Sequence, residues 1–276
     1  MHSGRAGQSF EENSKSTYEY VAVERRGPVA IVTMDRPQAL NAFDASLRRD
    51  ILLAAREVNA DDAIRVVILR GAGRGFGAGA DLAETPMSDP NWRVDDQLNL
   101  EYKPVMLEIY QAPKPWISAV HGPAAGISSA FAMVCDLTVM AEDAYIYQAF
   151  TAISLVPDGG ATWHLVRTIG RKRAYEIIAT GEKLPAAKCL EWGLCNRVVP
   201  TAELLSATVA WAEELAARAP RSVRYAKRAS AEACEADLWQ VISHEADLQR
   251  ICSASEDSAE GAAALMEKSA PRWQGR

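Results

Sequence analysis

The sequence of 276 residues contains no apolar run that approaches the roughly 20 residues needed to cross a membrane. Its first 17 residues also lack the apolar core of a secretory signal, and they are rich in polar and small residues. We therefore expect a disordered leader over residues 1–17 and no association with a membrane. The formal net charge of −6 argues against a nucleic-acid partner, because proteins that bind nucleic acids usually carry a basic surface.

Cysteine and histidine are scarce as well. The five cysteines form no C-x-x-C pair, and the four histidines are too scattered for a metal-binding motif. We expect reduced cysteines, as in a cytoplasmic protein, and no metal site. With 49% hydrophobic and 24% charged residues, the composition is that of a globular protein long enough to bury a large core.

Glycine, in contrast, is concentrated in one stretch, Arg65–Leu82. The apolar run Val66–Leu69 predicts a buried strand, and glycines then occupy every second position from Gly71 to Gly79. The backbone N–H groups of such a segment can approach a ligand closely, because few side chains shield them. An ordinary turn is one alternative. A dinucleotide-binding loop is another, although it would begin several residues after the strand. A P-loop is excluded, because no Gly-Lys-Ser/Thr follows.

Local patterns predict an α/β fold with strands in the first half and helices in the second. We expect a core over residues 18–200 and a helical C-terminal region over residues 201–276. Asp44 stands where a helix N-cap is expected, before apolar residues at helical spacing. The expected elements are a hairpin of Tyr18–Glu24 and Val29–Met34, strands at Trp116–Val120 and Leu137–Met140, a loop and broken helix over 88–111, and a turn at 156–160 before a short helix. From Arg171 onward nearly all residues are expected in helices, with breaks at Leu184-Pro185, Gly193, Val199-Pro200 and Ala219-Pro220.

Two segments of this pattern pass from a strand through a turn toward a helix, one after Leu69 and one after Val120. Each would offer a backbone N–H near a helix start, where the helix dipole favours negative charge. Two such groups that converge on one carbonyl oxygen form an oxyanion hole. That arrangement suits chemistry that turns a thioester into an enolate.

The chain resembles the enoyl-CoA hydratase/isomerase (crotonase) family in a series of motifs whose order and spacing are highly specific. The resemblance extends from about Tyr18 to the C-terminus, and its pattern is closest to the epoxyphenylacetyl-CoA isomerase and enoyl-CoA isomerase branch. The matching motifs are R-P-Q-A-L-N-A (36–42), G-F-G-A-G-A-D-L (75–82), P-W-I-S-A-V-H-G-P-A-A-G (115–126), C-D-L (135–137), Q-A-F-T-A-I-S-L-V-P-D-G-G-A-T (148–162), A-x-x-x-x-W-G-L-C-N-R-V-V-P (187–200) and S-E-D-S-A-E-G (255–261).

The resemblance implies a ββα spiral core and a helical C-terminal trimerisation region, so a homotrimer or a dimer of trimers is expected. The substrate would be an acyl-CoA thioester, with no separate cofactor because CoA is part of the substrate. By the same resemblance, the oxyanion-hole donors fall at the amides of Ala80 and Ile127. The other implied substrate-binding residues are Gln38, Ala39, Ala78, Gly79, Asp81, Leu82, Gly126, Phe150 and Trp163. For Asp81 we favour a loop-stabilising carboxylate, and Lys268 is a candidate contact for a CoA phosphate.

The chain departs from the family pattern at the two glutamates with which hydratases activate water. These positions hold Ala130 and Phe150, and neither side chain can transfer a proton. Asp158 falls where family members that shift double bonds carry their catalytic acid. We therefore predict that Asp158 shuttles one proton during double-bond isomerisation, with its pKa raised by apolar neighbours. The alternative role for Asp158 is a helix cap.

Three other functions remain open. A hydratase or a related hydrolase could use other groups, such as His121, Tyr145 or Tyr147. An unrelated serine hydrolase could use Ser128 in a near nucleophile elbow, with Asp158 and His244 following in the required order, although the last glycine of the elbow is missing. Alternatively, the protein could bind CoA esters without catalysis.

Overall fold

The computed structural model describes residues 18–84 and 91–276, so the expected leader lies outside the described residues. A central sheet has the strand order β1-β2-β3-β4-β6-β9. Strands β1 and β2 are antiparallel, and the other neighbours in this sheet are parallel. A smaller sheet has the order β5-β7-β8. The strands are β1 Val21–Arg26, β2 Val29–Met34, β3 Val66–Gly71, β4 Trp116–Val120, β5 Pro123–Ala125, β6 Leu137–Ala141, β7 Tyr145–Tyr147, β8 Lys183–Pro185 and β9 Arg197–Val199.

Strands β2, β3 and β4 are buried along nearly their whole length. Successive side chains of a strand point to opposite faces, so both faces of the central sheet are covered. Helix α7 packs across β2, β3, β4 and β6, while α1 packs on β1 and β2 and α4 on β4 and β6. The predicted α/β class, the hairpin and the buried strands are confirmed.

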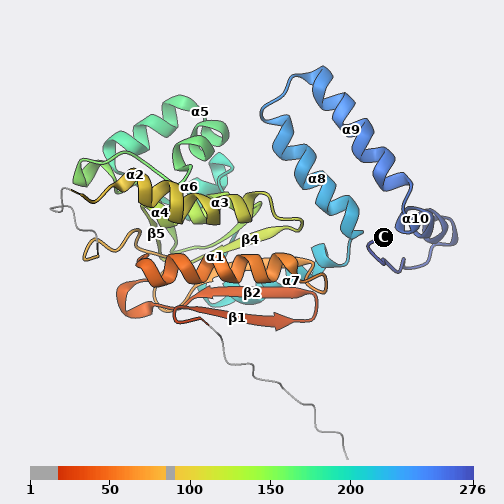
Figure 1. Cartoon of the computed structure of the whole chain (residues 1–276), viewed down its shortest axis with the longest axis horizontal. Coiled ribbons are helices and arrows are strands. Elements are labelled where there is room, and N and C mark those ends of the chain that lie inside the picture. Colours follow the sequence, from red (N-terminus) through yellow and green to blue (C-terminus); the bar gives the residue numbers. More distant parts are fainter. Residues whose placement is uncertain (1–17, 85–90) are drawn as a thin grey trace, which may run out of the picture.

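The helices fall into a group around the sheets and a group beyond them. Helices α8 and α9 contact each other and form a hairpin to one side of the sheets (Figure 1). The helices are α1 Ala45–Ala60, α2 Val94–Gln97, α3 Lys103–Tyr110, α4 Ile127–Val134, α5 Ala161–Thr180, α6 Ala186–Trp192, α7 Leu204–Ala216, α8 Pro220–Ala233, α9 Leu238–Ser253 and α10 Glu256–Glu267, with short turns η1 Pro37–Ala39, η2 Leu98–Tyr102, η3 Thr151–Ile153 and η4 Thr201–Glu203.

Helix α1 begins as the sequence predicts. The Asp44 carboxylate accepts a hydrogen bond from the Leu47 amide at 2.8 Å, which satisfies one of the free N–H groups of the first turn. Leu47, Ile51 and Val58 are fully buried on the side of the helix that faces the core. The local pattern and the capping residue therefore agree with the tertiary structure.

Two of the expected breaks in the helical region, at Leu184-Pro185 and Val199-Pro200, coincide with the three-residue strands β8 and β9. Two expectations about the elements need correction. The helix after the turn at 156–160 is not short: α5 has 20 residues, with a break in helical geometry at Gly170, whose φ is 78°. Instead of a broken helix, α2, η2 and α3 follow one another without a gap, and η2 is a π-helical turn.

All five cysteines are free. Within the described ranges, no helix is long and apolar enough to span a bilayer. The same residues contain no group of three or more His, Cys, Asp or Glu arranged to hold a metal ion.

Candidate active site

The glycine-rich segment after β3 lies between two other stretches of backbone. On one side, the Ala78 amide donates to the Leu40 carbonyl at 2.9 Å and the Phe43 amide donates to the Gly79 carbonyl at 2.8 Å. On the other side, the Gly77 carbonyl accepts from the Ala125 amide at 2.9 Å. Backbone hydrogen bonds therefore fix the loop on both edges.

Glycine is required where the loop meets the start of α4. The φ of Gly79 is 103°, and a Cβ atom there would lie 3.2 Å from the Ala125 carbonyl oxygen and 3.6 Å from the Gly126 Cα. Gly126 also has a positive φ, 51°. The two glycines thus lie against each other, and each immediately precedes one of the expected oxyanion-hole donors, Ala80 and Ile127.

The backbone geometry leaves both donor amides free to point toward a ligand. The Gly79 carbonyl and the Asp81 amide both bond to Phe43, as in a parallel bridge centred on Ala80. The Ala80 N–H must point the other way, away from Phe43. Ile127 is the first residue of α4, so its N–H has no acceptor within the helix.

Ser128 connects the two halves of this arrangement. Its buried Oγ accepts a hydrogen bond from the Gly79 amide at 2.9 Å. A Cβ atom on Gly77 would lie only 2.3 Å from the same Oγ, so the loop has no room for a side chain there. Next to it, the Ser129 Oγ donates to the Gly126 carbonyl at 2.7 Å. Side chains of α4 therefore hold the backbone on both sides of the expected oxyanion hole.

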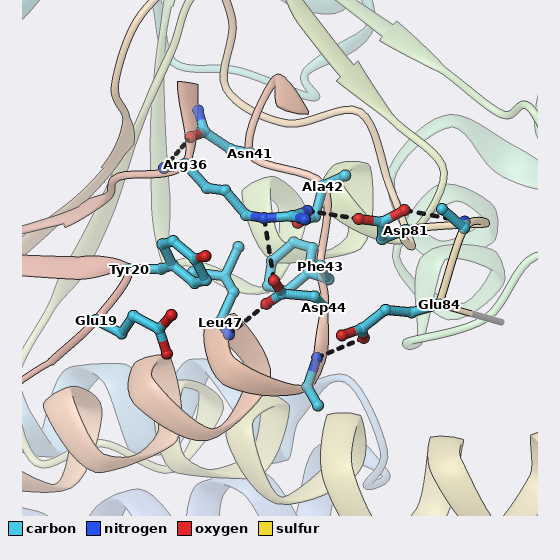
Figure 2. A network of polar contacts seen from close by, with 12 residues as sticks. Glu19, Tyr20, Arg36, Asn41, Ala42, Phe43, Asp44, Leu47, Asp81 and Glu84 are labelled. Carbon is cyan, nitrogen blue, oxygen red and sulfur yellow. Dashed lines mark hydrogen bonds and ion pairs between the residues drawn. The ribbon is translucent and has the colours of Figure 1, made fainter. Parts of the chain in front are cut away.

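Arg36 lies between two carboxylates, those of Asp44 and Asp81 (Figure 2). Its Nη1 is 2.6 Å from Asp81, and its Nε is 3.0 Å from Asp44. The hydrogen bond from Arg36 holds the pKa of Asp81 below its usual value. Asp81 also accepts a hydrogen bond from the Ala83 amide at 3.0 Å. These contacts are those of the loop-stabilising carboxylate that we favoured from the sequence.

Asn41 joins the segment around Arg36 to the glycine loop. Its Oδ1 accepts from the Arg36 amide at 2.9 Å, and its Nδ2 donates to the carbonyls of Ala72 and Gly75, each at 2.9 Å. The side chain is fully buried, and the backbone φ is 55°, which asparagine tolerates better than most residues.

The segment that bears Asp158 packs against the expected second donor through the following residue, Gly159. A Cβ atom on the next residue, Gly159, would be 2.4 Å from Ile127 Cδ1, 3.0 Å from Ala130 Cβ and 3.1 Å from Met106 Cε. The Asp158 Oδ1 atom is buried and has no hydrogen-bond partner. Burial raises the pKa of Asp158 to about 6, because an apolar environment disfavours the charged carboxylate.

Gly159 also lines a cavity of about 300 Å³. Trp163 lines it, with its ring 5.9 Å from that of Tyr110 and 4.8 Å from that of His164, both in edge-to-face geometry. Burial lowers the pKa of His164 to about 4, so this imidazole is neutral at pH 7. The cavity is lined by Met106, Leu107, Tyr110, Val134, Gly159, Gly160, Trp163, His164 and Glu235.

Comparison with known proteins gives the family. The family model described as "Enoyl-CoA hydratase/isomerase" matches residues 24–276. The chain belongs to the enoyl-CoA hydratase/isomerase family. It is 34% identical to a protein named "Probable enoyl-CoA hydratase echA8" from Mycobacterium tuberculosis, over 260 residues that cover 94% of this chain and 100% of the relative.

Two further relatives show how the names divide within the enoyl-CoA hydratase/isomerase family. The 1,2-epoxyphenylacetyl-CoA isomerase of Escherichia coli is 32% identical, and the match covers 94% of this chain and 99% of that protein. The crystal structure of an enoyl-CoA hydratase from Bacillus anthracis superposes with a TM-score of 0.89 at 30% identity, covering 94% of this chain and 100% of that one. The α/β crotonase fold with C-terminal helices is thereby established, while hydratase and isomerase names both occur.

The remaining family-implied residues lie in three places. Gln38 and Ala39 form η1, next to Leu40, which bonds to Ala78. Gln38, Ala78 and Leu82 are exposed, and Leu82 retains 52% of its accessible surface. Phe150 is buried just before η3, and its carbonyl accepts from the Leu155 amide at 2.9 Å. Lys268 ends α10 with a φ of 55°.

The serine hydrolase alternative is contradicted by the structure and by the family match. The Ser128 hydroxyl is buried and accepts from the Gly79 amide. His244 lies on α9, where its Nε2 is 2.6 Å from Glu232 of α8. His121 has a different contact, with its Nε2 3.0 Å from the Gly73 carbonyl oxygen. This contact ties His121 to the glycine-rich loop.

The sequence analysis missed Tyr102 and the hydrogen bond that Ser128 makes to Gly79. Tyr102 is 2% exposed, and the Arg48 guanidinium lies over its ring, 5.5 Å from the centroid. No motif marks it, because its position depends on how η2 and α3 meet the rest of the fold. Ser128 was visible in the sequence as a small residue at a helix start, but its acceptor role depends on a segment 49 residues away.

Proposed function

We propose that this protein isomerises unsaturated acyl-CoA thioesters, moving a double bond from the β,γ to the α,β position. The amides of Ala80 and Ile127 would bind the thioester oxygen. The Asp158 carboxylate would take a proton from the α-carbon, and the resulting enolate would be held by the two amides. Protonated Asp158 would then return the proton to the γ-carbon, so no other reactant is consumed.

The observation that supports this role most directly is the buried, unpartnered Asp158 Oδ1, next to Gly159, which packs against Ile127 and Ala130. With a pKa of about 6, the group is mostly ionised at neutral pH, and it accepts and returns a proton more evenly than an ordinary aspartate does. The positions of the hydratase glutamates hold Ala130 and Phe150, both buried and apolar. Water activation by that pair is therefore not an option for this chain.

The exposed end of the site suits the CoA part of the substrate. Gln38, Ala39 and Ala78 lie together where the Leu40 carbonyl bonds to the Ala78 amide, and we assign them to CoA binding. Gly79, Gly126 and Leu82 would form the adjoining part of the pocket, and Trp163 and Phe150 would bound the acyl group. We also propose that the protein assembles as a homotrimer or a dimer of trimers, as the family pattern implies.

The test is a series of β,γ-unsaturated acyl-CoA thioesters in water labelled with heavy oxygen. We expect the conjugated α,β product to form without uptake of label, and its formation can be monitored by its absorbance. Asp158→Asn should lower kcat by about 100-fold or more while the KM changes little. For the wild type, kcat/KM should rise with pH through about 6 and then level off, because the base form of Asp158 is required.

Asp143→Asn is the matched control, because Asp143 lies outside the site and accepts a hydrogen bond from Thr201 at 2.8 Å. It should retain wild-type turnover. Full isomerase activity in Asp158→Asn would overturn the role of this residue. Uptake of heavy oxygen at the rate of product formation would show that the reaction is hydration and not isomerisation.

A further inference from the structure

Another cavity lies at the opposite end of the central sheet from the proposed acyl-CoA site. Its volume is about 380 Å³, which is within the range of cavities that bind small molecules. Arg65, directly before β3, and Lys114, two residues before β4, both line it. The glycine-rich loop and the start of α4 follow the other ends of these strands. A strand as long as β3 spans about 20 Å, so the two sites are separate.

This cavity is strongly basic, although the chain as a whole has a formal net charge of −6. Five cationic side chains line it against one carboxylate, that of Asp62, so the lining carries a net charge of +4. Within residues 18–84 and 91–276, none of the five forms an ion pair with a carboxylate. Unpaired positive charge gathered in a cavity favours an anionic ligand. The five cations are Arg65, Lys114, Arg218, Arg221 and Arg224.

Lys114 is the most buried of these cations, and it lacks a counter-ion. It is 7% exposed, and its Nζ donates to the carbonyls of Val58 at 2.9 Å and Asp61 at 2.7 Å. An ammonium group has three N–H bonds, so the third is left for a ligand. The comparably buried Lys227 binds the Asp136 carboxylate at 2.8 Å. Burial lowers the pKa of Lys114, because it disfavours the charged form, and a bound anion would offset that cost.

Two of the arginines are held in place by the C-terminal tail. Arg65 donates to the Trp273 carbonyl at 3.2 Å, and the Arg221 Nε donates to the Gly275 carbonyl at 3.1 Å. The C-terminus accordingly lies beside the start of α8 (Figure 1). Carbonyl groups are neutral acceptors, so both guanidinium groups are positioned while their positive charge stays unbalanced.

The other two arginines, Arg218 and Arg224, are exposed and make no side-chain hydrogen bond to another described residue. Arg221 and Arg224 are three residues apart on α8, so they lie on the same side of this helix. The planar guanidinium group matches the oxygens of a phosphate, which it can bind with two parallel hydrogen bonds. One phosphate carries a charge of about −2 at most, so two phosphates are needed to balance the lining.

We propose that this cavity binds a ligand through a diphosphate group. The phosphate oxygens would accept hydrogen bonds from the third N–H of Lys114 and from the four arginines. The group belongs either to inorganic diphosphate or to a nucleoside diphosphate, which present the same chemistry to the cavity. The proposal does not depend on the proposed function, because the cavity shares no residue with the proposed acyl-CoA site.

The experiment measures the binding of inorganic diphosphate, ADP and inorganic phosphate to the full chain by calorimetry, at an ionic strength of about 0.15 M. The test variant is Arg218→Gln/Arg224→Gln, which removes two exposed charges from the cavity. The matched control is Arg171→Gln/Lys172→Gln, which removes two exposed charges from α5, outside the cavity. Thermal unfolding confirms that both variants are folded.

We expect the wild type to bind inorganic diphosphate about tenfold or more tightly than inorganic phosphate. Arg218→Gln/Arg224→Gln should weaken diphosphate binding by about tenfold or more, and the control should stay within about twofold of the wild type. ADP that binds about tenfold more tightly than inorganic diphosphate would identify the ligand as a nucleotide. ADP that binds no more tightly would identify it as inorganic diphosphate.

Three results would overturn the proposal. The first is a wild type that does not bind diphosphate at millimolar concentration. The second is diphosphate binding that Arg218→Gln/Arg224→Gln leaves unchanged, because the ligand would then lie elsewhere on the molecule. The third is equal weakening by the two double variants, because loss of overall positive charge alone has that effect. Turnover of an acyl-CoA enters none of these measurements.

Discussion

Ser128 shows how much a single hydroxyl contributes to the site. Its Oγ accepts from the Gly79 amide, and Gly79 precedes the expected donor Ala80. Without this acceptor, the Gly79 N–H would be buried and unsatisfied, which costs about 1–3 kcal/mol. The loop would also be free to rotate the neighbouring Ala80 amide away from the substrate oxygen.

Ser128→Ala is therefore expected to lower both stability and activity. The free energy of unfolding should fall by about 1–3 kcal/mol, and kcat on the best acyl-CoA substrate by about tenfold. Urea unfolding and steady-state kinetics measure the two effects. Ser118→Ala is the control: Ser118 is equally buried, and its Oγ donates to the Ala132 carbonyl at 2.9 Å. That variant should lose stability but keep its kcat, and equal kinetics in the two variants would contradict the positioning role of Ser128.

At the scale of elements, the site depends on loops that are tied together across long stretches of sequence. The Asn41 side chain bonds to four backbone groups, those of Arg36, Ala72, Gly75 and Phe76, and so connects the segment before α1 with the loop after β3. Its backbone φ of 55° adds a conformational requirement. Asn41 thus holds the glycine-rich loop of the expected oxyanion hole in addition to the serines of α4.

Asn41→Ala should lower the free energy of unfolding by about 2–4 kcal/mol, because it removes the side-chain hydrogen bonds and places a strained alanine at positive φ. Asn41→Gly removes the same bonds but relieves the backbone strain, so its stability should lie about 1 kcal/mol above that of the alanine variant. Chemical unfolding of both variants separates the two contributions. Equal stability of the two would show that backbone strain is unimportant at this position.

The elements that could be predicted from the sequence are those with local signals. The hairpin has a Gly-Pro turn between two apolar strands, and α1 has the Asp44 cap before its periodic apolar residues. Strands β5, β8 and β9 have only three residues each, and their existence depends on partners far away in the sequence. Length and periodicity carry too little information for segments of that size.

The same division applies to the candidate site. Motif resemblance pointed to Gly79, Gly126 and Asp158, and the structure brings the two glycines together and buries the Asp158 Oδ1. Tyr102 could not be found in this way, because the burial of its hydroxyl results from packing between η2, α1 and α4. Three-dimensional packing decides which polar atoms lose contact with water, and single-sequence patterns do not record it.

At the scale of the whole molecule, two half-buried groups give opposite dependences of stability on pH. The folded-state pKa of Asp158 is raised to about 6, so between about pH 4 and 6 the folded protein holds a proton that the unfolded chain releases. This contribution makes stability fall as pH rises. The pKa of His164 is lowered to about 4, so between about pH 6.5 and 4 the unfolded chain binds the extra proton, and stability falls as pH decreases.

Substituting one of the two residues should therefore leave only the other residue's effect on how stability changes with pH. The free energy of unfolding of Asp158→Asn should exceed that of wild type by about 1–2 kcal/mol at pH 7 and equal it near pH 4. The figure allows for partial screening by solvent. For His164→Gln, the difference in the free energy of unfolding from wild type should be about 1–2 kcal/mol more favourable near pH 4 than at pH 7. Urea unfolding at pH 4, 5.5 and 7 provides the measurement. Differences from wild type that stay constant with pH would show that neither group titrates abnormally.

The tight contact at Gly159 limits how this enzyme could acquire new substrates. A Cβ atom at that position would lie 2.4 Å from Ile127 Cδ1 and 3.0 Å from Ala130 Cβ, and the φ of 59° is strained for any residue with a side chain. Met106 also lies close to Gly159, through the flexible end of its side chain. Laboratory evolution toward bulkier thioesters should therefore accumulate its changes on α3, beginning with Met106, and leave residue 159 untouched.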